Sequence, residues 1–299
     1  MVDDSGRARL ARGLGRALIH LVLLGGVLVA AFPFLWMVLT SFKSYEEWIM
    51  ATFLPSTLRL SNYIEAWNYA PFPRYFANSI FLSFSQVVLV LLTSVLAAYA
   101  FARIDFLGKN VIFLGFLATM MIPFEVTLIP NFIIIRRVPF HPQLPLFGYN
   151  LLGTEQSGWY NSYAAMVVPF AASVFSIFLI RQHFAAIPQD LYDAALLDGC
   201  GHFRFLISVV LPLSKPVLLT VSLLNFLWSW NAFLWPLIVT GKEELRPIQV
   251  GISSFISESG AEVQLLMAAT TMALVPIIVL YLLAQRQFIE GIGRTGLKG

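Results

Sequence analysis

Long apolar runs separated by short charged segments are the feature of this 299-residue sequence that most restricts its fold. About 20 consecutive apolar residues are enough to cross the hydrocarbon core of a bilayer as an α-helix. Six such runs occur along the chain, at Ala17–Ser41, Phe76–Phe101, Val111–Ile135, Ala164–Phe184, Val217–Val239 and Leu265–Phe288. With 58% hydrophobic and 12% charged residues, the sequence predicts an all-α polytopic membrane protein with six transmembrane helices. Residues 1–299 are predicted to form a single transmembrane domain.

The third run is the least regular, because Pro123, Glu125 and Pro130 interrupt it. A helix broken at membrane depth needs shelter from protein or from a water-filled cavity. Glu125 is also the one acidic residue inside an apolar stretch, and an intramembrane carboxylate is a candidate functional residue. The alternative is that Glu125 lies near the outer end of its span, in contact with water.

Basic residues indicate how the chain is oriented. With the N-terminus in the cytoplasm, twelve of the 19 Lys and Arg residues lie in inner segments and seven in outer ones. The positive-inside rule therefore places both termini in the cytoplasm. This asymmetry accounts for the net charge of +3, which does not indicate a nucleic-acid partner.

Three outer segments are sizeable, namely 42–75, 137–163 and the charged segment 241–264, and the first two have a recognisable pattern. Residues 42–75 contain "LRLSNYIEAW", whose pattern predicts a short amphipathic helix at the interface with Tyr63 and Trp67 as anchors. Residues 137–163 are rich in proline, glycine and aromatic residues, which predicts an extended, irregular extracellular loop.

The inner segment 185–216 is more polar than its surroundings and contains "DLYDAALLDGCGHFRFLISVVLPLSKP". One face of a first helix is indicated at helical spacing by Leu191, Ala194, Ala195 and Asp198. A second helix starts near Gly201 and repeats the spacing with Phe203, Leu206, Ile207 and Val210. Gly199 lies where a left-handed helix C-cap is expected, so the segment is predicted to be two short helices joined at a glycine. Periodicity alone leaves two alternatives, a helix pair packed under its own bundle or a docking surface.

The residues of this segment resemble a known motif. "DAALLDG" followed by "VVLPLSKP" resembles the EAA motif of ABC-importer permease subunits, in which Glu-Ala-Ala, a glycine and a later Leu-Pro occur at fixed spacing. Asp193 to Ala195 match its start, Gly199 its glycine and Leu211-Pro212 its end. Asp193 departs from the usual Glu, which keeps the charge but shortens the reach by one methylene. Cys200 stands where a small residue, often Ala, is common.

The resemblance covers nearly the whole chain. "SWNAFLWPLIV", "FLIRQHFAAIPQDLYDAA" and the tail "GIGRTGLKG" are similar to segments of carbohydrate-uptake permeases of the maltose-transporter type, in its smaller, six-span subunit. The loop 137–163 departs from that group in being longer. The resemblance implies a bacterial cytoplasmic (inner) membrane protein that forms half of a sugar translocation pathway by alternating access.

The resemblance also implies partners. A second permease subunit completes a heterodimer, two cytoplasmic ATPase subunits dock on the coupling loop 185–216, and an extracellular or periplasmic solute-binding protein delivers the sugar. The ATPase-coupling residues implied are Asp193, Ala194, Ala195, Asp198, Gly199 and Phe203. In the cytoplasmic tail, residues 289–299, the implied contacts are Gly296, Lys298 and Gly299.

No phosphate-binding loop is found in the sequence. The Gly-Lys pairs at 108–109 and 241–242 lack the glycine five residues before the second glycine of a Gly-x-x-x-x-Gly-Lys-Ser/Thr motif. We therefore expect no cofactor in this chain, with ATP and Mg bound by the partner ATPase. The chain itself is expected not to be an enzyme.

Candidate substrate-pathway residues lie in the fifth run, in "NFLWSWNAFLWP". On one continuous helix, Asn225, Trp228, Asn231 and Trp235 would share an arc of about 120°. Amides can donate to and accept from sugar hydroxyls, while indole rings cover the apolar face of a pyranose. The alternative is that the asparagines join helices and the tryptophans mark the outer interface, an interpretation that fits Trp235 best.

Two other classes of function remain as alternatives. An ion-coupled secondary transporter of a small polar solute would carry charged groups near the bilayer midplane, but the runs contain almost none besides Glu125. A membrane enzyme would need converging His, Asp, Glu or Ser residues, and the four histidines are scattered. The single cysteine, Cys200, cannot form an intramolecular disulfide or build a metal site by itself.

Overall fold

The computed structural model describes residues 4–138, 145–146, 149–150, 158–257 and 260–295. The chain divides into two compact units, one of residues 1–69 with 255–272 and one of residues 70–254 with 273–299. Helix α15, Val263–Thr295, begins in the first unit and continues into the second, with Pro276 inside it. It runs through Thr295, into the segment 289–299 that the sequence assigns to the tail.

The first unit is built on the long helix α1, Asp4–Ser41. Its apolar side chains from Leu14 to Leu35 are exposed, as expected for a surface that meets lipid. The short helices α2, Tyr45–Ile49, and α3, Ser61–Tyr69, follow, and α3 confirms the helix predicted from "LRLSNYIEAW". The unit also holds the hairpin of β3, Ile256–Ser257, and β4, Gly260–Ala261, in which Ile256 pairs with Ala261.

The segment after α1 is held by local polar contacts. Ser44 and Glu47 form a capping box at the start of α2, and both Glu47 carboxylate oxygens accept hydrogen bonds, from Ser44 N and from Ser56 N. Lys43 is buried, with its Nζ 4.1 Å from the centre of the Trp36 ring and 2.6 Å from the Thr52 carbonyl, to which it donates. These contacts fix the chain where it leaves the membrane span.

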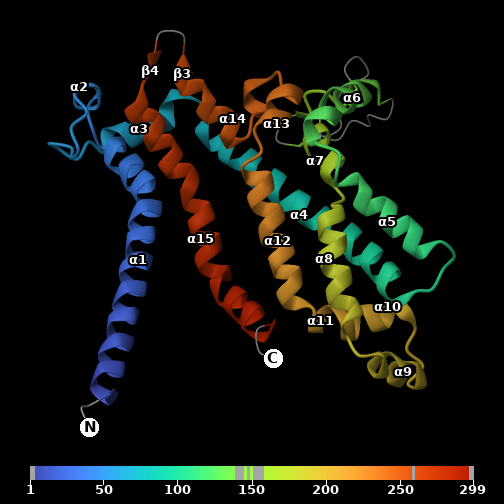
Figure 1. Cartoon of the computed structure of the whole chain (residues 1–299). Coiled ribbons are helices and arrows are strands. Elements are labelled where there is room, and N and C mark those ends of the chain that lie inside the picture. Colours follow the sequence, from blue (N-terminus) through green and yellow to red (C-terminus); the bar gives the residue numbers. More distant parts are fainter. Residues whose placement is uncertain (1–3, 139–144, 147–148, 151–157, 258–259, 296–299) are drawn as a thin grey trace. The chain divides into compact units, whose positions relative to one another are not determined.

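The second unit is built around α4, Phe72–Arg103, which packs against α8, Val174–Ala185, and α12, Lys215–Trp230 (Figure 1). Buried polar side chains follow one side of α4 at helical spacing, namely Asn78, Ser79, Ser83, Gln86 and Ser94. Because an apolar helix in lipid needs no such stripe, the stripe indicates a face that packs on protein.

Two of the expected spans are bent. Helix α5, Lys109–Thr119, meets α6, Phe124–Arg137, at 97°, and the break at Pro123 confirms part of the predicted interruption. Pro130, by contrast, lies inside α6. The helices α7, Tyr163–Val167, and η1, Val168–Phe170, precede a 42° bend into α8.

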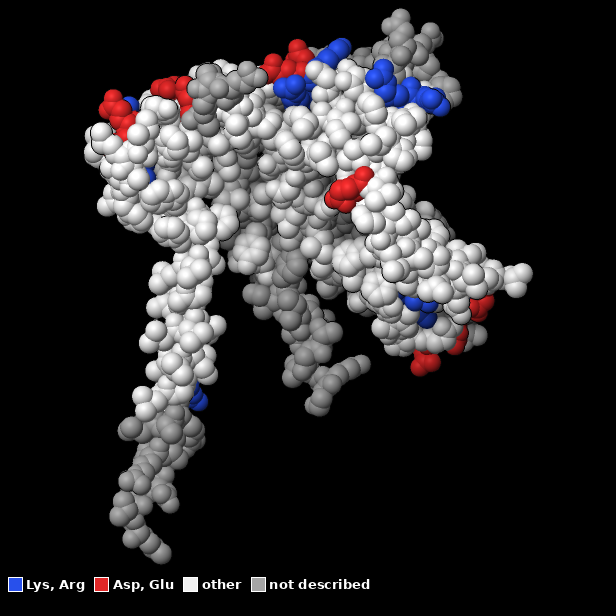
Figure 2. All heavy atoms as spheres, turned by 45° about the horizontal axis from the view of Figure 1, so that its top comes forward, with Lys and Arg blue, Asp and Glu red and all other residues white. Residues whose placement is uncertain are grey.

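By length and composition, the described residues contain three helices able to cross a membrane and up to six if each bent pair is one span. The six-span, all-α prediction is confirmed in this sense, with short hairpins as the only strands among the described residues. In Figure 2 most charged side chains gather toward the top and the lower right of the view, and the surface between them is mostly uncharged apart from one acidic group.

The fifth span differs from the expectation of one helix over Val217–Val239. Helix α12 ends at Trp230, and after a short break α13 occupies Leu234–Val239. Pro236 cannot donate a backbone hydrogen bond, which favours interruption of the helix before it. The arc worked out for one continuous helix is therefore wrong beyond Trp230.

The loop 137–163 contains a hairpin of β1, Pro145–Leu146, and β2, Tyr149–Asn150, paired Pro145 to Asn150 and Leu146 to Tyr149. Its residues 139–144, 147–148 and 151–157 lie outside the described residues. The predicted tail contacts Gly296, Lys298 and Gly299 lie outside them as well.

The segment after α13 packs on the first turns of α4. It contains η3, Glu243–Leu245, α14, Ile248–Ile252, and η4, Ser253–Phe255. Asn78 Nδ2 donates to the carbonyls of Glu244 and Arg246, at 2.8 and 3.0 Å, and Tyr75 Oη donates to Glu243 at 2.8 Å. Gly251 lies directly against the Tyr75 ring. This end of α4 is thus joined to the segment by hydrogen bonds and close packing.

Candidate functional site

The segment 185–216 forms the two short helices that the sequence predicts. Helix α9 is Gln189–Leu197, α10 is His202–Phe205, and α10 continues as a π-helical turn, η2, Leu206–Val210, and α11, Leu211–Leu213. The second helix therefore ends at Leu213, just past the Leu-Pro pair, and an 80° bend leads into α12.

The turn at Gly199 is a left-handed helix C-cap. Its φ is +73°, a region that residues with a Cβ rarely adopt. Cys200 N donates to the Ala195 carbonyl at 2.8 Å and Gly199 N donates to the Leu196 carbonyl at 3.0 Å. These are the two hydrogen bonds of a Schellman motif, so the turn at this glycine sets the angle between α9 and α10.

The two helices have clearly different faces. Asp193, Ala194, Asp198, Gly199 and Phe203 are exposed, and the Phe203 side chain is 68% exposed. Exposed leucines add to this surface, with Leu197 91% exposed. We call the exposed set Leu191, Ala194, Leu197, Asp198 and Phe203 the outer face of the loop.

The opposite face packs on the second unit's own core. Ala195 is half-buried, with Tyr192 and Cys200, against a cluster that includes the fully buried Phe205. The two alanines of the predicted patch thus point to different sides, Ala194 outward and Ala195 inward. Asp193 Oδ1 accepts a hydrogen bond from Gln189 Nε2 at 3.2 Å within the exposed part of α9.

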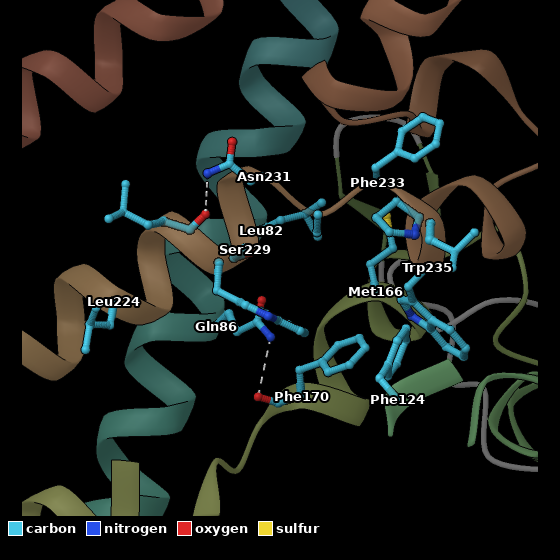
Figure 3. Close-up of a pocket in the computed structure, with 15 residues that line it drawn as sticks. Leu82, Gln86, Phe124, Met166, Phe170, Leu224, Ser229, Asn231, Phe233 and Trp235 are labelled. Carbon is cyan, nitrogen blue, oxygen red and sulfur yellow. Dashed lines mark hydrogen bonds between the residues drawn. The ribbon is translucent and has the colours of Figure 1, made fainter. Parts of the chain in front are cut away.

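A cavity of about 490 Å³ lies between α4, η1, α12 and α13 (Figure 3). Its walls are mainly apolar and aromatic, and the described residues that line it carry no charge. Gln86, Ser229 and Asn231 supply polar groups. A few convergent polar groups in a largely apolar cavity are typical of a site for a small ligand.

Trp228 and Asn231, two of the predicted pathway residues, line this cavity. Trp228 is 52% exposed and packs edge-on against Phe170, with ring centres 5.0 Å apart. Asn231 is the C-cap of α12; its Nδ2 donates to the Leu227 carbonyl at 2.8 Å, and its Oδ1 lies 3.3 Å from Gln249 Nε2. An exposed ring and an exposed amide are thus available at the cavity wall.

The other two predicted pathway residues have structural partners. Trp235 lines the cavity but is 3% exposed, and its Nε1–H donates to the Ala165 carbonyl at 2.8 Å. Asn225 is not among the lining residues; its Nδ2 donates to Ser176 Oγ on α8 at 3.0 Å. Glu125 is exposed in the first turn of α6 and does not line the cavity.

A model of the family "Binding-protein-dependent transport system inner membrane component" matches residues 90–294, which include the loop and most of the cavity wall. The chain belongs to this family. It is therefore a membrane permease subunit, and membership supports the predicted importer over the ion-coupled alternative.

Relatives of the permease match along most of its length. The arabinooligosaccharides transport system permease protein of Halalkalibacterium halodurans is 34% identical, covering 91% of this chain and 92% of the relative. The diacetylchitobiose uptake system permease protein of Streptomyces coelicolor is 32% identical, covering 91% and 85%. A bacterial ABC transporter that imports the acidic polysaccharide alginate has a similar chain of known structure, with a TM-score of 0.77, 26% identity and coverage of 93% and 97%.

Sequence reasoning missed most of the residues that line the cavity of the permease, the amide Gln86 among them. Gln86 is 5% exposed in the middle of α4, and its Nε2 lies 3.5 Å from the Phe170 carbonyl (Figure 3). A signal was present, since Gln86 is an amide inside the apolar run Phe76–Phe101. Among the described residues, no cluster of three His, Cys, Asp or Glu side chains could hold a metal ion.

Proposed function

We propose that this permease forms half of the translocation pathway of an ATP-driven importer of an uncharged oligosaccharide. The observation that carries the substrate class is the cavity of α4, α12 and α13, whose walls are aromatic and uncharged and present amides at their surface. Sugar rings stack on such aromatic faces and hydrogen-bond to amides. The arabinooligosaccharide and diacetylchitobiose permeases among its relatives support the same class.

The outer face of the loop is the proposed docking surface for the ATPase subunits. The sequence lacks a phosphate-binding loop, so force generated by ATP hydrolysis has to reach this chain through a protein contact. Exposed leucines and Phe203 form an apolar surface at a rigid turn, which suits burial against another protein. The partners are two ATPase subunits, which bind ATP and Mg, a second permease subunit and a solute-binding protein.

Purification of the assembled complex tests this function. Co-expression of the permease with a second permease subunit, the ATPase and the solute-binding protein should yield vesicles in which sugar uptake requires ATP. The purified single chain should hydrolyse no ATP. Turnover by the single chain, or uptake driven by an ion gradient in the absence of ATP, would refute the proposal.

Alanine substitution of Trp228 and Asn231 tests the cavity. Each variant should lower sugar uptake several-fold while the amount of assembled complex stays unchanged, because both side chains are exposed at the wall. Asn225→Ala is the matched comparison, since this amide joins α12 to α8 and its loss should reduce assembly instead. Loss of assembly in all three variants would favour a packing role for Trp228 and Asn231.

The orientation with both termini in the cytoplasm is also part of the proposal, and Cys200 is its probe. This single cysteine is partly exposed in the loop, so a membrane-impermeant maleimide should label it in inside-out vesicles and not in right-side-out vesicles. A Cys200→Ala, Thr57→Cys variant should show the reverse, because Thr57 is exposed in the outer segment. Labelling of Cys200 from the outside would overturn the orientation.

A further inference from the structure

The inner end of α4 contacts the loop at two separate places, and the first is Arg103. This arginine is in the last turn of α4. Its Nη2 donates to the carbonyls of Phe184, at 2.9 Å, and Ile187, and its Nη1 donates to Gln189 Oε1 at 2.9 Å. The guanidinium adds a charged donor to carbonyls at and just after the end of α8, and charged donors make stronger hydrogen bonds than neutral ones. Arg103 thus fixes the start of the loop.

The second contact joins α4 to both helices of the loop through His202. Tyr99 Oη on α4 lies 3.1 Å from His202 Nδ1 at the start of α10. The His202 ring stacks on Tyr192 of α9, with ring centres 5.3 Å apart and planes 22° apart, and Tyr192 Oη lies 3.1 Å from His202 Nε2. One imidazole therefore links three helices.

Apolar packing accompanies these polar contacts. Tyr99 and Phe101 of α4 are buried in the same cluster as Phe205 and Leu206 of the loop, and Phe205 packs edge-on against Tyr192 at 5.1 Å. Apolar packing resists separation but does not fix direction, whereas hydrogen bonds depend on angle. The polar contacts therefore set how the loop is turned against α4.

The chain also changes direction at two points, one within the loop and one where the loop ends. Gly199 has a φ that only glycine adopts readily, and the chain bends by 80° between α11 and α12 around Ser214. Without the polar contacts to α4, apolar packing and the chain at Ser214 would remain to carry a force from the outer face to the membrane helices. With the contacts of Arg103, Tyr99 and His202 in place, that force is also transmitted directly to α4.

We propose that Tyr99, Arg103 and His202 are positioning residues that couple movement of the loop to movement of α4. The proposal rests on the proposed function, in which the outer face of the loop receives the push from an ATPase. Helix α4 runs without a break from its inner end to the cavity, where Gln86 and Leu82 form part of the wall. Tyr99 and Gln86 are about 20 Å apart along the helix, at 1.5 Å per residue.

Uptake of sugar per ATP hydrolysed, measured in vesicles with the assembled complex, tests the proposal. Tyr99→Phe removes only the hydroxyl and His202→Leu removes the polar ring, and each should lower this ratio roughly fivefold while ATP hydrolysis continues, the effect expected for one lost hydrogen bond. The double variant should lower the ratio no further than His202→Leu does, because both changes break one link. His202→Gln, which keeps hydrogen-bonding groups, should restore part of the ratio.

Two controls separate this proposal from a structural role and from failure of the docking surface. Tyr281→Phe removes a hydroxyl from an exposed tyrosine on α15 and should leave the ratio unchanged. An unchanged ratio in Tyr99→Phe and His202→Leu, or equal losses of uptake and hydrolysis that follow a lower amount of complex, would overturn the positioning role. Phe203→Asp tests the docking surface itself and should weaken ATPase binding. Normal ATPase binding by this variant would refute the docking surface, and with it the positioning role that rests on the surface.

Discussion

Valine at position 199 is the substitution with the clearest physical consequence for coupling. Gly199 has a φ of +73°, and a Cβ built there has no atom within 4 Å. The added Cβ therefore meets no neighbour, and the cost worked out here is that of the backbone conformation. A left-handed conformation costs an L-residue roughly 1–2 kcal/mol, and a β-branched residue lies at the upper end.

A cost of this size changes the population of the native turn by a factor of about 5 to 30. Because the two hydrogen bonds of the Schellman motif depend on this turn, Gly199→Val should displace α10 relative to α9 and remove most sugar-stimulated ATP hydrolysis and uptake. Both rates are measured in vesicles containing the assembled complex, normalised to the amount of permease.

Two variants sharpen the test. Gly199→Asn should retain more activity than valine, because asparagine adopts the left-handed region more readily. Gly201→Ala adds the same kind of group two residues away, where the backbone is extended with φ −77° and again no atom lies within 4 Å, so activity should be retained. Normal uptake by Gly199→Val at normal complex levels would refute the reasoning.

Two further predictions concern stability. Gly251→Ala would place a methyl group 2.1 Å from a ring carbon of Tyr75, so it should destabilise the second unit by about 1–3 kcal/mol or more. Gly115→Ala is the control and should not destabilise it, because no atom lies within 4 Å of a Cβ built there. The midpoint of thermal unfolding in detergent measures both effects, and equal midpoints for the two variants would contradict the close packing. Hydrogen bonds, first that from the Ser56 hydroxyl, lower the pKa of Glu47 to about 2, so its contribution to the structure of residues 44–56 is present above pH 4.5 and is lost as the pH falls toward 2. Pepsin cleavage within 44–56 should rise over that window, and Glu47→Gln should abolish the pH dependence.

The spans and the loop could be predicted from sequence because each depends on local signals. Apolar length marks a span, and Gly199 marks a C-cap, since both follow from single-residue chemistry and spacing. The break after Trp230 could not be placed from the same information, because the apolar run continues through it. Pro236 is a local signal that disfavours a continuous helix, but it does not place the break at Trp230.

Side-chain partners were less predictable than helices. Spacing placed Asn225 and Trp228 on one arc of α12, yet the structure gives Asn225 a partner on α8 and leaves Trp228 at the cavity. Periodicity likewise grouped Ala194 with Ala195, which lie on different sides of α9. Such differences depend on which helices are neighbours, and a pattern along one helix does not contain that information.

The end of α12 beside the cavity has a consequence for how this permease could change its substrate. Where a helix stops, the carbonyl groups of its last turn lose their intrahelical partners and become acceptors. Here the carbonyls of the lining residues Leu227 and Ser229 each accept from the chain just beyond Trp230, from Asn231 and Ala232, and a carbonyl oxygen has a second lone pair for a further donor. Mutation can exchange those side chains but cannot remove the main-chain oxygens. New sugar preferences could therefore evolve by side-chain replacement over a constant set of backbone acceptors.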